Sequence, residues 1–143
     1  MHPRILRIID ANINRISEGL RVLEDIARFI VEDVSASRQL KTIRHQLNQL
    51  VISIGTDLIE NRDSEGDIGS QFDLVHEHKD LSSVVRANAK RVQEGIRVLE
   101  EISKLPEFKS ILITAELKKF RYAVYSAEKT LVAGLLKIQK GDK

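Results

Sequence analysis

The chain has 143 residues, no cysteine and a formal net charge of +2. This length predicts one domain, residues 1–143, large enough to bury a core, and the lack of cysteine excludes disulfides and thiolate zinc sites. Interspersed charges of both signs and few aromatic residues, four Phe and two Tyr, argue against nucleic-acid binding. Because no long apolar run and no signal peptide is present, we expect a cytoplasmic protein with no membrane partner.

Apolar residues spaced three and four apart predict a first helix from about residue 5 to about residue 32. The segment "VEDVSASRQL" interrupts this pattern, and Ser35 or Ser37 is the expected N-cap of a second helix. That helix extends through "VISIG", because the three-and-four spacing continues there despite its β-branched residues.

Periodicity is absent from residues 61–80, which predicts a long loop of the kind that is usually functional or disordered. A third helix is expected over about residues 80–103, ended by Leu105 and Pro106. A fourth is expected over about residues 107–137.

The chain contains an internal repeat, at about residues 5–60 and 81–137. "ANINRISEGLRVLEDI" (11–26) reappears as "ANAKRVQEGIRVLEEI" (87–102), and "LKTIRH" (40–45) as "LKKFRY" (117–122). The repeating unit is a helical hairpin, used twice. We therefore predict an all-α bundle of two duplicated hairpins, related by a pseudo-twofold axis and joined by the loop.

Polar letters repeat as well as apolar ones, which core packing alone does not require. On a helical wheel Asn12, Arg15 and Gly19 fall at the margin of the apolar stripe, whereas Arg21 and Glu24 point mostly to solvent. Glu24 is then expected in an ordinary surface pair four residues along the helix. A glycine kept twice inside a helix, despite costing about 1 kcal/mol against Ala, indicates either a close helix crossing or a bound ligand.

The loop letters "RDSEGDIG" (62–69) are chemically suggestive. Asp63, Glu65 and Asp67 supply the oxygen ligands that Mg²⁺ prefers, while Gly66 and Gly69 would let backbone N–H groups approach a phosphate. A polar connection with turn residues explains the same letters, and no EF-hand or standard phosphate-loop motif is present. His76 and His78 could bind metal, although a solvated loop is the more common role of such a pair.

Together these helices, the loop and "LKTIRHQL" resemble the single-function hydroxymethylpyrimidine phosphate kinase family of thiamine biosynthesis, over about residues 4–137. The resemblance implies that ATP phosphorylates 4-amino-5-hydroxymethyl-2-methylpyrimidine phosphate to its pyrophosphate. In this family the domain is often fused in front of thiamine phosphate synthase, which implies a functional link to that enzyme. Because this sequence ends without a barrel domain, we expect a stand-alone member or an excised piece.

Phosphoryl transfer needs positioned cations and a metal ion that offset charge on the phosphates, with ATP as donor and Mg²⁺ as cofactor. Candidates for these roles come mostly from the repeated positions. The expected catalytic residues are Arg15, Arg91, Arg44 and Arg121; the substrate-binding residues are Asn12, Asn88, Arg62, Gly66 and Gly69; and the metal ligands are Asp63, Asp67, Glu18 and Glu94.

The rival interpretation is a non-catalytic helical module that docks a partner or binds a nucleotide for regulation. Apolar surface left on four helices is compatible with a homodimer but does not require one.

Overall fold

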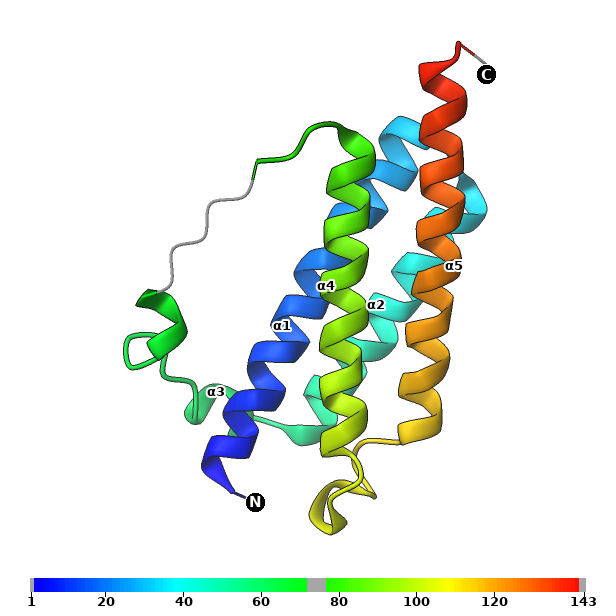
Figure 1. The fold of residues 1–143 in the computed structure, drawn as a ribbon. Coiled ribbons are helices and arrows are strands. Elements are labelled where there is room, and N and C mark those ends of the chain that lie inside the picture. Colours follow the sequence, from blue (N-terminus) through cyan, green and yellow to red (C-terminus); the bar gives the residue numbers. More distant parts are fainter. Residues whose placement is uncertain (1, 72–76, 142–143) are drawn as a thin grey trace.

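A computed structural model describes residues 2–71 and 77–141, and it shows an all-α bundle, as predicted. Four long helices run side by side: α1 (Pro3–Ile26), α2 (Val34–Ile54), α4 (Leu81–Ile102) and α5 (Thr114–Gln139) (Figure 1). The short α3 (Asp57–Glu60) follows α2, and residues 61–71 continue from it beside the bundle.

The first helix begins where its sequence supplies a cap. Pro3 occupies the first turn, and the His2 side chain accepts a hydrogen bond from the Arg4 N–H group. After Ile26 the helix widens into a π-helical turn, Ala27–Val31, and it ends at Glu32 in the left-handed conformation (φ 58°). The predicted end near residue 32 is therefore confirmed, with an irregular last turn.

The second helix is capped by a different residue from those predicted. Asp33, not Ser35 or Ser37, accepts a hydrogen bond from the N–H of Ala36 at 2.9 Å. The π-helical turn ends just before Asp33, so α2 begins at least two residues earlier than predicted. The "VISI" end is helical as expected, and it stops at Gly55, whose φ of 80° favours glycine.

The segment predicted as a loop contains one short helical turn among its described residues, Ile68–Gln71, and α3 lies just before it. Leu58 on α3 is buried in the core, so the start of this connection is anchored to the bundle. The 72–76 part of the predicted loop, which includes His76, lies outside the described residues.

The last helix begins seven residues later than predicted, at Thr114 rather than near residue 107. The intervening chain forms a 3₁₀ turn, Pro106–Phe108, and Phe108 and Leu112 are both buried. These two apolar side chains cover the end of the bundle, which a straight helix from residue 107 would not allow. The apolar residues between α4 and α5 are therefore spaced for packing into the core, although the segment is not an α-helix.

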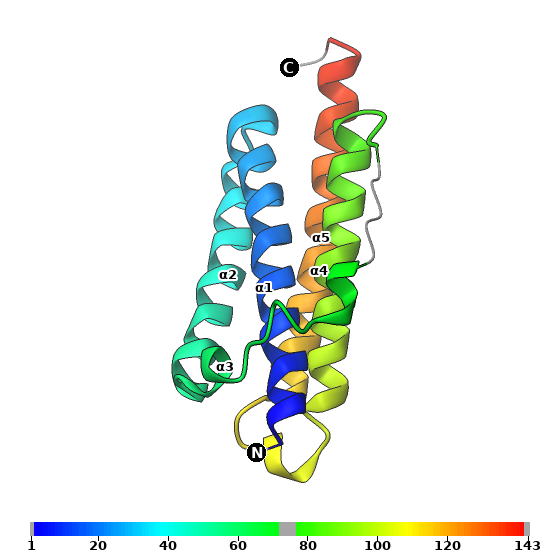
Figure 2. The same ribbon diagram turned by 90° about the vertical axis from the view of Figure 1, so that its left-hand side faces the viewer.

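The two hairpins, α1–α2 and α4–α5, lie side by side and meet mainly along α1 and α4 (Figure 2). A Cβ added at Gly19 would lie 2.6 Å from Val92, and one added at Gly95 would lie 2.7 Å from Ile16, the repeat counterpart of Val92. These reciprocal contacts are what the predicted pseudo-twofold requires. They also decide the role of the two glycines: each permits the close crossing of α1 and α4.

Among the described residues, no helix is long and apolar enough to cross a membrane.

Candidate functional site

The loop after α3 is fastened to the N-terminal half of α1 by one ion pair. Arg62 donates two hydrogen bonds to Asp10, from Nε to Oδ2 and from Nη2 to Oδ1, both 2.7 Å long. Donating these hydrogen bonds to Asp10 raises the pKa of Arg62 above its ordinary value. Asp10 is buried although it is charged, and a buried carboxylate needs such a partner.

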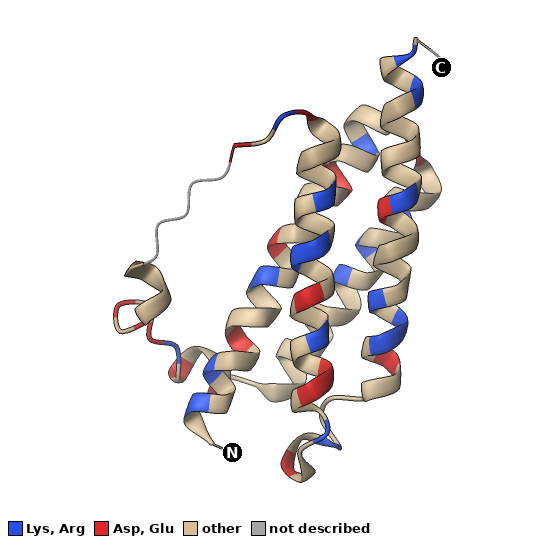
Figure 3. Cartoon of the chain, in the orientation of Figure 1, with Lys and Arg blue, Asp and Glu red and all other residues tan. Residues whose placement is uncertain are grey.

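A cavity of about 600 Å³ lies between α1 and this loop. That volume is typical of a small-molecule site. Four arginines line it, together with two loop carboxylates and the polar edge of α1; the lining includes Arg4, Arg7, Arg15, Arg62, Asp63, Asp67, Asn12 and Asn14. Figure 3 shows the same grouping, with basic segments at the N-terminal end of α1 beside the charged loop. Several predicted site residues therefore do come together.

Arg15 is oriented by a residue of the same helix. Its Nη1 donates to Oδ1 of Asn12 at 2.9 Å, and the Asn12 amide donates in turn to the backbone oxygen of Ile8 at 2.8 Å. Asn12 is buried, whereas Arg15 is exposed at the cavity wall. The amide is thus held in one orientation and holds the guanidinium toward the opening.

The two loop glycines are used differently from what the sequence suggested. The N–H of Gly66 donates to Asp63 at 2.7 Å, and the N–H of Gly69 donates to Asp67 at 2.8 Å. Each carboxylate therefore closes a tight turn of its own loop. Phosphate binding by these N–H groups stays a prediction, and it would require both turns to open.

The predicted metal ligands are divided between separate places. Asp63 and Asp67 line the cavity. Glu18 lies about one turn beyond Arg15 on α1 and pairs with Arg91 of α4 at 3.5 Å. Glu94 pairs with Lys90 of its own helix at 3.9 Å. Across residues 2–71 and 77–141, no three acidic or histidine side chains, His78 included, are grouped to hold a metal ion.

The second pair of repeated arginines is partly buried between the helices of each hairpin. Arg44 donates to Glu24 at 2.5 and 3.1 Å, and Arg121 donates to Glu100 at 2.6 and 3.2 Å. Each pair joins the two helices of one hairpin, so the duplication repeats the interaction. Hydrogen bonding to Glu100 raises the pKa of Arg121 above its ordinary value, although burial acts in the opposite direction.

The helical-wheel prediction that Glu24 points to solvent is therefore wrong. It is buried, with 7% of its surface exposed, instead of pointing to solvent, because Arg44 reaches it from α2. Asn88 matches Asn12 in donating to a carbonyl four residues earlier, that of Val84, at 2.8 Å. It lies at the α1–α4 crossing and not at the cavity beside the loop.

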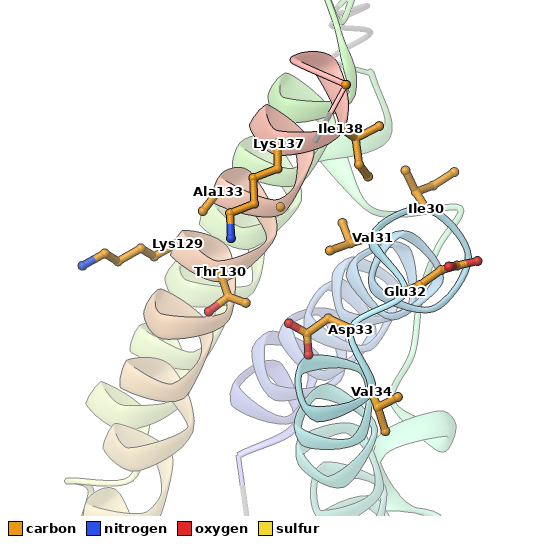
Figure 4. Close-up of a pocket in the computed structure, with 12 residues that line it drawn as sticks. Ile30, Val31, Glu32, Asp33, Val34, Lys129, Thr130, Ala133, Lys137 and Ile138 are labelled. Carbon is orange, nitrogen blue, oxygen red and sulfur yellow. The ribbon is translucent and has the colours of Figure 1, made fainter. Parts of the chain in front are cut away.

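A larger opening lies elsewhere, between α5 and the segment from the π-helical turn to the start of α2. It holds about 1030 Å³, and Figure 4 shows its two walls. Lys129, Thr130 and Lys137 come from α5, while Glu32 and Asp33 come from the turn before α2. Its remaining lining is largely aliphatic, and none of the residues predicted from the sequence to bind substrate or metal lies there.

Sequence reasoning missed Arg4, Arg7 and Asp10. Arg4, Arg7 and Arg15 are separated by three and eight residues, spacings that place side chains on one side of a helix. This pattern could have been read from the letters. The link from Asp10 to Arg62, 52 residues away, left no such periodic signal.

The fold and cavity define a small helical-bundle protein with an arginine-lined opening suited to an anionic ligand. Residues 7–130 match the ThiD2 family, so the chain belongs to that family.

Longer proteins named thiamine-phosphate synthase are similar to this chain. The protein from Rhodopirellula baltica is 39% identical over 134 residues, which cover 92% of this chain and 36% of that protein. The Synechocystis protein is 37% identical over 134 residues, covering 92% and 37%, and the Prochlorococcus marinus protein 33% over 140 residues, covering 98% and 38%. The chain thus spans less than two fifths of the length of these relatives. No solved structure matches it.

Proposed function

We propose that this protein acts in thiamine biosynthesis, as the kinase that converts 4-amino-5-hydroxymethyl-2-methylpyrimidine phosphate to the pyrophosphate. The observation that carries the proposal is the cavity in which α1 arginines face a loop bearing two carboxylates. Family membership and the names of the longer relatives add to it.

In the proposed reaction an oxygen of the substrate phosphate attacks the γ-phosphorus of ATP. A new P–O–P bond forms, the bond from the γ-phosphorus to the β,γ-bridging oxygen breaks, and ADP leaves with that oxygen. The attacking group is already an anion near neutral pH, so the protein needs no strong general base. Its contribution is to position both phosphates and to offset their charge.

Arg15 is the residue best placed for that work. Asn12 holds its guanidinium at the cavity wall, and a guanidinium can bind phosphate oxygens with two parallel hydrogen bonds. Arg4 and Arg7 add positive charge on the same wall. Arg44 and Arg121 are assigned a supporting role instead, because each is already bound by two hydrogen bonds to a glutamate.

Asp63 and Asp67 fit a magnesium ion that arrives with the nucleotide. Mg²⁺ commonly takes only one or two protein carboxylates, with phosphate and water oxygens completing its shell. Each of these aspartates uses Oδ1 in its own turn, which leaves Oδ2 as the candidate ligand atom. Bound Mg²⁺ would offset charge on the phosphates during transfer.

The proposal is tested by a ³¹P NMR time course with purified protein, ATP, Mg²⁺ and the pyrimidine phosphate. We expect pyrophosphate-ester signals to grow together with ADP, and to stop when EDTA removes the metal. An absence of turnover in folded protein, with an authentic kinase working in the same buffer, would refute the kinase activity.

A docking or regulatory module is the second candidate, because the chain spans only part of its longer relatives. A kinase should be stabilised against heat by Mg²⁺ and ATP through mass action. A docking module should show no such shift, and a regulatory nucleotide binder should show it without turnover.

A further inference from the structure

The two halves of the molecule differ at the positions that build the cavity. Five polar residues of α1 recur unchanged 76 positions later on α4: Asn12, Arg15, Glu18, Arg21 and Glu24. Asp10, however, is replaced by Arg86, Arg4 by Asp80 and Arg7 by Ser83.

The exchange of Asp10 for Arg86 removes the attachment point for the loop. Asp10 has 6% of its surface exposed and receives both hydrogen bonds from Arg62. A guanidinium has no acceptor atom, so Arg86 could not receive them. Arg86 is exposed and lines a different groove between α4 and α5, beside Lys90 and Arg97.

The other two exchanges leave the start of α4 without counterparts of Arg4 and Arg7. Asp80 caps the start of α4, with its carboxylate accepting both the N–H and the hydroxyl of Ser83. Two acceptor or neutral side chains therefore stand where the first half presents two arginines. Of the three α1 arginines that line the cavity, only Arg15 has a basic counterpart, Arg91, and that residue pairs with Glu18.

We propose that the protein has a single phosphate-binding site, on its first half, and that Asp10 is the positioning residue that establishes it. By holding Arg62, Asp10 fixes the loop so that Asp63 and Asp67 lie opposite the α1 arginines. The identity of the ligand rests on the proposed function, whereas the location of the site and the role of Asp10 do not.

A positioning role for Asp10 predicts that Asp10→Asn changes phosphate affinity in the opposite direction from that expected from charge alone. Asp10 is a negative charge at the wall of a cavity meant for an anion. If it acted only through its charge, the substitution Asp10→Asn would strengthen phosphate binding. If it positions the loop, the same substitution weakens binding, because the loop is released.

The test uses the whole chain and two measurements that need no turnover. Calorimetry with inorganic pyrophosphate gives the affinity of the site. Limited trypsin digestion reports how mobile the loop is. The rate of cleavage after Arg62 is divided by the rate of cleavage after Lys109, which is exposed, so that global unfolding is corrected for.

For Asp10→Asn we expect affinity to fall and relative cleavage after Arg62 to rise, each by about tenfold, the usual effect of losing charge-assisted hydrogen bonds. Arg62→Lys keeps the charge and the cleavage site but loses the two-pronged geometry, so it should shift both in the same direction, less strongly. It replaces Asp10→Asn if that variant fails to fold. The matched control Arg86→Gln, at the counterpart position, should change neither.

Tighter pyrophosphate binding by Asp10→Asn, or unchanged cleavage after Arg62, would overturn the positioning role. Weakened binding by Arg86→Gln, or no binding by the unmodified protein, would overturn the single site on the first half. Absence of kinase turnover alongside the expected binding and cleavage would refute the proposed function and leave this inference standing.

Discussion

Replacing Gly19 with alanine tests whether the repeated glycines serve the crossing of α1 and α4. The new Cβ would lie 2.6 Å from Cγ2 of Val92, which is fully buried, and 3.1 Å from the backbone oxygen of Asn88. Alanine should favour the isolated helix by about 1 kcal/mol. Overpacking a dense core costs about 1–3 kcal/mol, and here the oxygen belongs to a helix backbone that cannot move alone. We therefore expect a cost in the upper half of that range, about 2–3 kcal/mol, and a net destabilisation of about 1–2 kcal/mol.

Gly95 provides the matched comparison. A Cβ there meets Cγ1 of Ile16 at 2.7 Å, but the nearest backbone atom, the oxygen of Asn12, is 3.6 Å away, an ordinary contact. A side chain can adjust more easily than a helix backbone. Gly95→Ala should thus be less destabilising than Gly19→Ala, although the helix propensities of the two substitutions are the same.

The assay is urea unfolding followed by circular dichroism at 222 nm. Adding Val92→Ala to Gly19→Ala removes the closest clash, so the double variant should be more stable than the sum of the single effects predicts. If Gly19→Ala instead raised the free energy of unfolding by the full helix-propensity gain, the close crossing would not be the reason for glycine.

Three further outcomes follow from the geometry. Glu100→Gln removes the partner of a largely buried Arg121 and should lower the free energy of unfolding by about 3–5 kcal/mol, measured by urea titration; a loss below about 1 kcal/mol would show that water solvates the arginine. Arg15→Ala should reduce turnover by about 10²-fold or more with an unchanged helical spectrum, and Arg91→Ala, paired with Glu18, should reduce it less; equal effects would contradict the assignment of the site to α1. Hydrogen bonds from Ser83 lower the pKa of Asp80 below its ordinary value, so its stabilisation is present above that ordinary value and is lost as pH falls through the lower folded-state pKa. The gap in urea midpoint between wild type and Asp80→Ala should therefore close only in acid, and a pH-independent gap would contradict the capping role.

The existence and pairing of the long helices could be predicted because burial leaves a periodic record. The apolar stripe of α1 follows the 3.6-residue period, and the copy on α4 shows that the same packing is used twice. The predicted beginning of α5 was wrong because burial produced a similar apolar spacing outside the helix. Phe108 and Leu112 are spaced as on a helix, but they fill the end of the bundle from a turn.

Contacts between distant segments left a weaker record in the sequence. Glu24 was placed in solvent by its angle on the wheel, because the wheel cannot show an arginine arriving from another helix. The repeat did contain the information: Glu24 and Arg44 recur together as Glu100 and Arg121, and a pair kept in both copies suits an interaction within each hairpin. The link between Asp10 and Arg62 occurs once, so no such comparison could reveal it.

The duplicated polar residues are explained by architecture more than by chemistry. Three repeated features support both halves alike: the glycines at the helix crossing, the glutamate–arginine pairs within the hairpins, and the asparagines bonded to their own helices. An asymmetric reaction, with one donor and one acceptor, cannot be carried by features that treat the halves equally. The positions that break the repeat, Asp10 above all, are therefore where substitutions should separate function from folding.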